Sequence, residues 1–392
     1  MQLRTLLVAL LLVVAAGPAL ATGAVAAEQP AQTTAAQDDA LDCEYPIEVE
    51  DATGETVRIE DEPEEIVILY PNVAQHVWEI GAQEKVVGMP VNDNTAYLEG
   101  SEDREHILTQ SDQGFDVPDT EKIVDMDHDL VLSPNVTPRD AVQELRDSGQ
   151  TVFHYPLSSD FEDVMDLVER TGQLVGDCES AREVTDEMAD RIATVEEATA
   201  DVEEPRVFYD LGDDPVGPFT VNENAFEHQV LDLAGAENIA ADINGSFAGA
   251  AYPQISTEEV IGEKPEYVVA PGPLSEFPGY NETPALQNDQ VIQVNGDFIS
   301  QHGPRTVDVL VNIAEELHPD AMAAAQADGT GDDGSEDGAG DGNDGMDGNG
   351  MDDDTTDDEG TDGAADDSGP GLTVGVAAAA LVALALLAVR RE

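Results

Sequence analysis

The sequence predicts an α/β protein built from two Rossmann-like lobes, each with a mainly parallel sheet, that are joined by a long linking helix. The first observation is a series of short apolar runs that alternate with helical patterns, which is typical of parallel sheets covered on both faces. The second is that this alternation stops at residue 161 and resumes after residue 202. The third is the length of 392 residues, which is enough for two domains and flanking segments.

The first lobe is expected at residues 42–160. Two helical patterns within it, at residues 74–80 and 139–148, are each followed by a glycine that can end a helix. Short apolar runs predict its strands, at residues 65–69, 85–88, 129–132 and 151–155.

Residues 161–202 are expected to form the helical linker, because they contain no strand signal and are interrupted only at Gly172 and Gly176. The second lobe is expected at residues 203–319. Its predicted strands are 206–209, 267–270 and 291–294, and its predicted helices are 224–234 and 306–317. Open α/β sheets bind ligands at the carboxyl ends of their strands, so we expect a cleft there, between the two lobes.

The charge balance restricts the possible partners. The chain carries 85 acidic and 15 basic residues, a formal net charge of −70, and this argues against nucleic acid because phosphate binding needs a basic surface. Global disorder is not indicated, since 41% of the residues are hydrophobic. A folded protein this acidic repels itself in dilute salt, but molar salt shortens the Debye length to about 3 Å. We therefore infer an extremely salt-loving source, such as a halophilic archaeon; a generic acidic protein is the alternative.

Both ends of the chain carry membrane signals. Residues 1–27 are expected to be a secretory signal peptide, with Arg4, an apolar run and small residues in order, although an uncleaved anchor is the alternative. At the other end, residues 372–389 form an uncharged run of about 27 Å as a helix, long enough to span a bilayer. The arginines that follow keep that end cytoplasmic, which places the body of the protein outside the cell.

Residues 370–392 resemble the PGF-CTERM sorting signal of archaea, with Pro370, Gly371 and Leu372 where that signal has Pro-Gly-Phe. The resemblance implies an archaeosortase that replaces the segment with a lipid. Residues 320–369 are rich in Asp and Gly and are expected to be a disordered spacer. The protein is thus expected on the extracellular face of the membrane, anchored by its C-terminus.

The cysteines and histidines exclude several kinds of site. Two cysteines cannot make a disulfide-dense scaffold or a four-cysteine zinc site. An extracellular location favours a disulfide between Cys43 and Cys178, with two free thiols as the alternative. The seven histidines have no zinc-ligand spacing, and no nucleophile elbow or phosphate loop occurs in the sequence. We therefore predict no catalytic residue, no metal site, no cofactor and no enzymatic activity.

Candidate ligand-binding residues are the aromatic and polar side chains that follow the predicted strands. Aromatic faces with a few polar groups suit a large, partly flat ligand. The alternative for each aromatic is packing in the core or in a loop. The candidates are Tyr70, Asn72, Tyr97, Asn135, Asp210, Tyr252, Asp297, Phe298 and His302.

Six segments resemble the substrate-binding proteins of ABC importers, in the class III group with a helical backbone that captures cobalamin, iron-siderophores and haem. The likeness covers residues 47–319, and the segments are 63–68, 78–88, 119–132, 229–239, 253–261 and Gly303-Pro-Arg305. The resemblance implies a rigid linker, modest closure on binding, and delivery to a permease with its ATPase. It also implies one docking glutamate in each lobe, Glu121 and Glu258, that pairs with permease arginines.

Cobalamin or a related corrinoid is the expected ligand, because the lobes and linker hold too few bases to suit a polyanionic siderophore. An Fe(III)-siderophore or haem is the alternative within the family. Two other classes stay open: a surface adhesive or structural protein, and a chelatase-like enzyme for which His302 is the only candidate residue.

Overall fold

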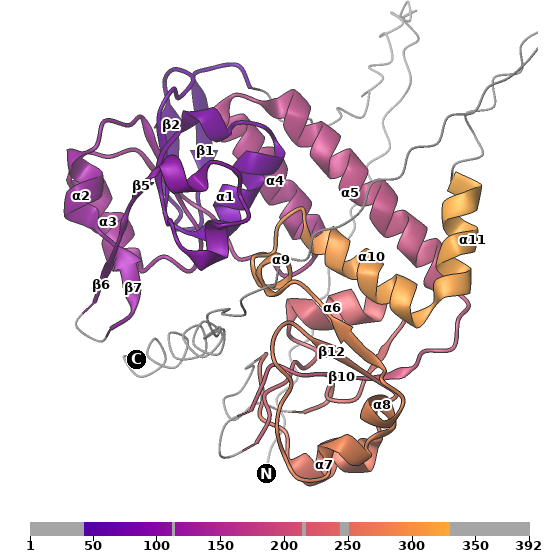
Figure 1. The fold of residues 1–392 in the computed structure, drawn as a ribbon. Helices are drawn as coiled ribbons and strands as arrows, with labels where there is room; N and C mark the ends of the chain where they lie inside the picture. The colour runs from indigo at the N-terminus through magenta and orange to yellow at the C-terminus, as the bar shows by residue number, and fades with distance from the viewer. Residues whose placement is uncertain (1–42, 112–113, 214–216, 244–250, 330–392) are drawn as a thin grey trace, which may run out of the picture. The chain divides into compact units, whose positions relative to one another are not determined.

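The computed structural model describes residues 43–111, 114–213, 217–243 and 251–329, which contain two α/β lobes and a helical linker (Figure 1). Two parallel sheets form the lobes, as the alternating pattern of the sequence requires. The predicted fold class is therefore confirmed.

The sheet of the N-terminal lobe has five parallel strands in the order β5-β4-β3-β8-β9. Every residue of β3 and β8 is buried, which explains why β3 and all of β8 except Ser133 are apolar. The strands are β3 (Ile66–Ile68), β4 (Val86–Met89), β5 (Glu105–His106), β8 (Leu130–Ser133) and β9 (Val152–His154), and the helices are α1 (Pro71–Glu79), α2 (Thr120–Asp125) and α3 (Arg139–Asp147).

Two antiparallel hairpins and several single-turn helices supplement this sheet, and the sequence analysis missed them. The first hairpin joins β1 (Ile47–Glu50) to β2 (Thr56–Ile59), with apolar side chains on one face only. Its turn holds Asp51, whose buried carboxylate pairs with Arg146 of α3. The other elements are β6 (Leu108–Gln110), β7 (Asp116–Pro118), η1 (Gln83–Lys85), η2 (Asp93–Thr95) and η3 (Ser101–Asp103).

The linker consists of α4 (Phe161–Val175) and the longer α5 (Cys178–Thr199), which pack side by side. The chain turns between them at Gly176, whose φ of 87° lies in the left-handed region that glycine tolerates best. Gly172 allows the close approach of the two helices, because a Cβ there would lie 2.4 Å from the Cβ of Ala181.

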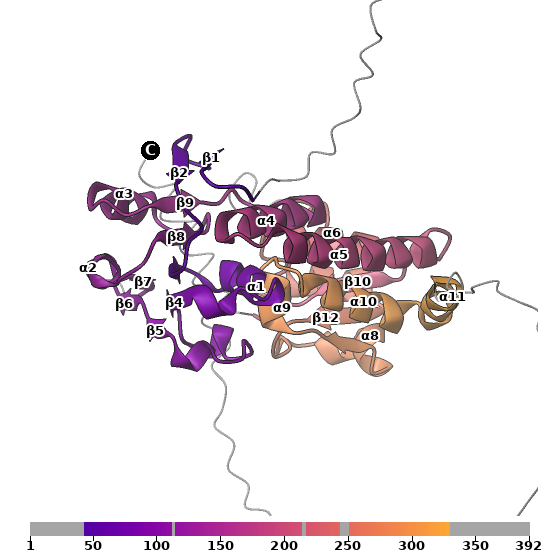
Figure 2. The same ribbon diagram turned by 90° about the horizontal axis from the view of Figure 1, so that it is seen from above.

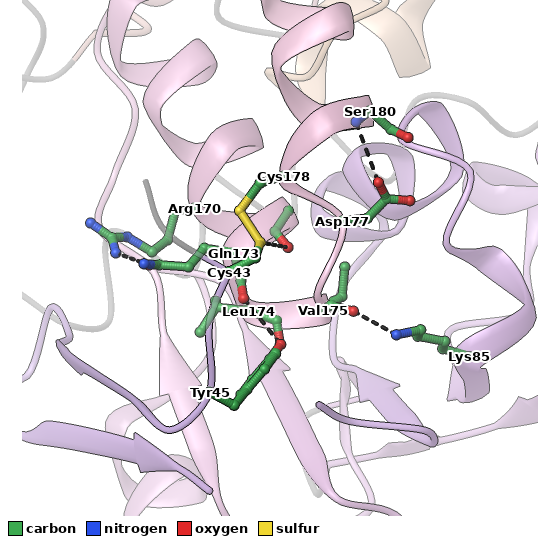
Figure 3. Close-up of a disulfide and its surroundings, with 11 residues drawn as sticks. Cys43, Tyr45, Lys85, Arg170, Gln173, Leu174, Val175, Asp177, Cys178 and Ser180 are labelled. Carbon is green, nitrogen blue, oxygen red and sulfur yellow. Dashed lines mark hydrogen bonds between the residues drawn. A yellow bond between two sulfur atoms is a disulfide. The ribbon is translucent and has the colours of Figure 1, made fainter. Parts of the chain in front are cut away.

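A disulfide between Cys43 and Cys178 fastens the start of α5 to the N-terminal lobe (Figure 3). Beside it, the hydroxyl of Tyr45 donates to the carbonyl oxygens of Gln173 and Leu174, at 3.2 and 3.3 Å. Lys85 Nζ donates to the carbonyl oxygen of Val175 at 2.6 Å. These contacts occupy carbonyl groups at the end of α4 that the helix itself leaves without partners.

The sheet of the C-terminal lobe has four parallel strands in the order β11-β10-β12-β13. Its strands are β10 (Arg206–Tyr209), β11 (Glu237–Asn238), β12 (Tyr267–Ala270) and β13 (Val291–Gln293). Its helices are α6 (Phe226–Leu233), α7 (Thr257–Glu263), η4 (Tyr280–Glu282), α8 (Pro284–Gln287), α9 (Gly296–Ser300) and α10 (Thr306–Leu317).

The chain continues into α11 (Pro319–Gly329), and Figure 2 shows α10 followed by α11, both of which pack against α5. The spacer predicted from residue 320 is therefore wrong over its first ten residues, because buried Met322 and Ala325 give them an apolar face. The rest of that spacer, the predicted signal peptide at 1–27 and the sorting segment at 370–392 lie outside the described residues. No helix within 43–329, its gaps aside, is long and apolar enough to cross a membrane.

Candidate ligand-binding site

An exposed apolar surface lies at the carboxyl ends of two neighbouring strands of the N-terminal lobe. Val136 follows β8 and is 40% exposed, and Leu157 follows β9 and is 60% exposed. They are the large apolar side chains that the described part of the chain leaves exposed. Single exposed apolar residues are common, but these two follow neighbouring strands at the carboxyl edge of a parallel sheet, which is where open α/β sheets bind ligands, so they form a candidate contact surface. Asn135, a predicted ligand residue, is exposed in the same turn as Val136.

Tyr70 and Asn72, at the end of β3 and the start of α1, are half-buried. Tyr70 packs against the apolar cluster on one side of the sheet, and burial raises the pKa of its phenol. The Oδ1 atom of Asn72 is buried and has no hydrogen-bond partner among the described residues. A buried oxygen without a partner is a candidate acceptor for a ligand donor.

The structure brings together two predicted residues from opposite lobes, Tyr97 and Phe298. Their rings meet edge to face with centroids 5.2 Å apart. The hydroxyl of Tyr97 donates to Oε1 of Gln301 at 2.6 Å and accepts from Nε2 of Gln75 at 2.9 Å. Nε2 of Gln301 also donates to the carbonyl oxygen of Asn94 at 2.9 Å, so each lobe binds the other directly at this point.

Arg305 completes this contact between the lobes. Its guanidinium carbon lies 5.3 Å from the ring centroid of Tyr97 and 5.3 Å from that of Phe298. Its Nε pairs with Glu79 of α1 at 2.5 Å, and its backbone N–H donates to Oε1 of Gln75 at 3.0 Å. We call these six residues the interlobe cluster: Gln75, Glu79, Tyr97, Phe298, Gln301 and Arg305.

Asp297, another predicted ligand residue, is next to Phe298 at the start of α9. Burial raises the pKa of its carboxyl, and the negative charge of Asp93 in the other lobe raises it further. A second carboxylate on the facing lobe therefore makes this edge of the cluster acidic.

His302 lies between the lobes and is mostly buried. Its ring stacks on Phe226 with centroids 4.3 Å apart, and its Nδ1 is 3.3 Å from the hydroxyl oxygen of Ser158. Burial lowers the pKa of His302 to about 4 and that of neighbouring His76 also to about 4. Both imidazoles are therefore uncharged at neutral pH and add no positive charge to the site.

Tyr252 covers a buried carboxyl group in the C-terminal lobe. Its hydroxyl donates to the two carboxylate oxygens of Glu227, at 3.3 and 3.2 Å. Glu227 is only 5% exposed, and burial raises the pKa of its carboxyl to about 7. The hydroxyl of Tyr209, also buried beside Glu227, finds no partner within the described residues. Residues 244–250, which shortly precede Tyr252 in the sequence, lie outside the described part.

The structure places Asp210 away from the interlobe cluster. Its carboxylate is fully buried and accepts hydrogen bonds from the backbone and hydroxyl of Ser275, at 2.9 and 2.5 Å, and from the hydroxyl of Tyr280 at 2.8 Å. The backbone N–H of Gly212 is a further donor at 3.0 Å. With these four donors, Asp210 fixes the loop after β12 inside the C-terminal lobe.

The two predicted docking glutamates occupy equivalent places in the two lobes. Glu121 and Glu258 are exposed in the first turns of α2 and α7. Asp119 and Ser256 cap these helices, and in both cases a threonine separates the cap from the glutamate. A hollow of about 480 Å³ adjoins Glu121, and a second of about 430 Å³ lies between the β1–β2 turn and α3.

The single tryptophan, Trp78, is half-buried on α1 beside the interlobe cluster. Its Nε1 donates to the carbonyl oxygen of Glu99 at 2.9 Å, and the guanidinium of Arg104 lies 6.0 Å from its ring centroid.

Sequence reasoning missed several residues of the site. Arg305 was named only as part of the motif Gly303-Pro-Arg305 that contributes to the family resemblance. Neither Gln75 nor Glu227 stands out in a sequence with so many polar residues. Val136 and Leu157 were missed because their exposure follows from the fold alone. No group of three or more His, Cys, Asp or Glu side chains that could hold a metal occurs in the part of the chain that the structure describes.

The sequence profile of the periplasmic binding proteins matches residues 66–297. The chain belongs to this family. Periplasmic binding proteins carry substrates and are not enzymes.

Several relatives cover most of the chain. The cobalamin-binding protein of Halobacterium salinarum is 32% identical over 330 residues, covering 81% of this chain and 85% of that protein. The vitamin B12-binding protein of Vibrio parahaemolyticus is 24% identical over 269 residues, covering 67% of this chain and 92% of its own.

Solved structures with the same fold include the vitamin B12 binding protein of Vibrio cholerae, with a TM-score of 0.53 and 23% identity over 67% of this chain and 98% of that one. A heme binding protein, HmuT, has a TM-score of 0.55 and 18% identity over 70% of this chain and 90% of its own. At these identities, the likeness shows the fold alone.

Proposed function

We propose that this protein is the cell-surface substrate-binding protein of an ABC importer, and that it captures cobalamin or a related corrinoid and delivers it to a permease. The observation that carries the proposal is the exposure of two apolar side chains, Val136 and Leu157, after neighbouring strands at the carboxyl edge of the N-terminal sheet. Corrinoids have a broad, partly apolar ring system that can bury such a surface. The relative at 32% identity is itself named a cobalamin-binding protein.

The charges near the interlobe cluster support a corrinoid over a polyanionic siderophore. Arg305 is paired with Glu79, while Asp93 and Asp297 face each other from the two lobes. Arg305 is thus the one base of this group, and Glu79, Asp93 and Asp297 are three acids, so the local electrostatic field is negative. His302, which lies between the lobes, is uncharged and does not change this balance. A polyanionic ferric chelate is repelled by that field, whereas a near-neutral corrinoid with amide donors is not.

We infer that Glu121 and Glu258 dock the protein on its permease. The support for this inference is that both glutamates follow the capping residue of a helix at equivalent positions in the two lobes. The two lobes therefore present similar carboxylates to one partner. Replacing both with glutamine is expected to reduce stimulation of the transporter's ATPase about tenfold or more. Asp140→Asn, in the first turn of α3, is the matched control and is expected to change nothing. Equal stimulation by both variants contradicts the docking role.

We also propose that the protein lies on the extracellular face of the membrane and is anchored there by its C-terminus. The sequence signals at both ends and the disulfide between Cys43 and Cys178 support an oxidising compartment. Protease treatment of whole cells is expected to remove the protein. Full protection in intact cells, with digestion after lysis, contradicts the proposed location.

A spectral titration at molar KCl tests the ligand. Purified protein is titrated with cyanocobalamin, a ferric hydroxamate and haemin, and saturable one-to-one binding is expected for cyanocobalamin. Leu157→Asp is expected to weaken it about tenfold, since an exposed apolar contact becomes a charge. Ala323→Asp adds the same charge on α11 and serves as the control. Binding of only the ferric hydroxamate or haemin contradicts the corrinoid assignment, and binding of none contradicts all three.

A further inference from the structure

We propose that Arg305 is a positioning residue for ligand binding, which holds the Tyr97 and Phe298 rings in one fixed arrangement across the two lobes. The inference rests on the proposed function for its ligand, but its geometry is independent of which ligand binds. Tyr97 belongs to the N-terminal lobe and Phe298 to α9 of the C-terminal lobe, and both are only half-buried. Each ring thus keeps part of its surface exposed.

The guanidinium of Arg305 contacts both rings at once. It lies 5.3 Å from each centroid, within the range of an attractive cation–π contact. The Nε–Glu79 contact of 2.5 Å fixes the plane of the guanidinium from the other lobe. A group held in this way restricts both rings, while their mutual edge-to-face contact of 5.2 Å restricts them further.

Gln75 shows that this arrangement is built into the fold. Its side chain is fully buried, its Oε1 accepts from the backbone of Arg305, and its Nε2 donates to Tyr97. Separating the lobes here leaves a buried amide without these partners, which is costly. Gly303 makes the approach possible, because a Cβ at this position would lie 2.3 Å from Oε1 of Gln75.

The chemistry of Arg305 separates two explanations of its role. If the rings depend on the planar guanidinium, Lys cannot replace Arg, because an ammonium group does not stack in the same way. If only the ion pair with Glu79 matters, Lys restores the function. Ligand affinity in Arg305→Lys therefore distinguishes positioning of the rings from a general bond between the lobes.

The experiment measures the cyanocobalamin dissociation constant at molar KCl for Arg305→Met, Arg305→Lys and Glu79→Gln. Both Arg305 variants are expected to weaken binding about tenfold, and Glu79→Gln less than about threefold. The matched control is Arg191→Met, which removes an arginine that pairs with Asp308 of α10 at 2.6 Å but contacts no ring in the described structure. It is expected to bind as the wild type does. Wild-type affinity in Arg305→Lys or in Arg305→Met overturns the proposal.

A second measurement needs no ligand and separates this proposal from the proposed function. Amide hydrogen exchange is followed in the ligand-free proteins over residues 92–98 and 296–301, with circular dichroism to verify folding. Arg305→Met is expected to accelerate exchange in both segments, and Arg191→Met in neither. If wild-type protein binds no cyanocobalamin, the corrinoid function fails, and unchanged exchange in Arg305→Met then overturns the positioning role as well.

Discussion

Glu227 offers a quantitative test of the buried part of the site. Burial raises the pKa of its carboxyl from 4.5 to about 7, and the side chain is only 5% exposed, so solvent screens little of this effect. The folded protein therefore binds this proton more tightly than the unfolded chain does. The free energy of unfolding falls as the pH rises from about 4.5 to about 7, and the full loss is about 3 kcal/mol above that window.

Glu227→Gln removes the ionisation while keeping an acceptor for the hydroxyl of Tyr252. The variant is expected to match the wild type below pH 4.5 and to exceed it by about 3 kcal/mol above pH 7. Urea denaturation at molar KCl, repeated across this pH range, measures the difference. Glu223→Gln, an exposed glutamate in the preceding turn, is the control and is expected to show no such trend. A difference that is constant with pH refutes the reasoning.

Three further predictions concern stability and are measured by urea denaturation at molar KCl. Replacing both Cys43 and Cys178 by serine is expected to lower the free energy of unfolding by up to about 5 kcal/mol, because the disulfide spans 135 residues of sequence. If reductant destabilises the variant by the same amount, the loss does not come from the disulfide. Gly172→Ala is expected to destabilise the protein by about 2 kcal/mol, because the added methyl group clashes with Ala181. Gly262→Ala on α7 is the control and is expected not to destabilise it, since a Cβ there has open space. Similar losses of stability in the two variants refute the packing argument. Arg146→Met is expected to cost about 3 kcal/mol because it leaves the buried Asp51 carboxylate without its charged partner, whereas Arg58→Met removes an exposed arginine and is expected to cost much less. A reversed order of the two losses contradicts this reasoning.

Most strands of both sheets could be predicted because they contain short runs of mainly buried apolar residues, whereas the two-residue strands β5 and β11 were missed because neither contains such a run. β3 and the first three residues of β8 are apolar runs, and such runs between helical patterns have few other interpretations. The β1–β2 hairpin was missed because only one of its faces is apolar, and polar and charged residues fill the other. The helix α11 was missed because it directly precedes the acidic region, and its two buried side chains are a weak signal.

The site was predictable only in part. Tyr97 and Phe298 were predicted as separate candidates because each follows a predicted strand. No local pattern in the sequence indicates that the rings of two residues 201 positions apart meet edge to face. Arg305 and Gln75 could not be assigned, because their roles follow from how the two lobes pack. Asp210 follows a strand as a ligand residue would, yet its donors come from a loop of its own lobe. The part that each residue plays in ligand binding stays a prediction.

Trp78 gives this protein a built-in optical reporter. Because the chain has one tryptophan, all its indole emission comes from a single position on α1, adjacent in sequence to Glu79. The ring is held by its bond to Glu99 and by Arg104, so its surroundings change when the neighbouring segments shift. A bound ligand that absorbs near the emission wavelength of indole quenches the fluorescence of Trp78 by energy transfer. Occupancy can therefore be followed without attaching a dye.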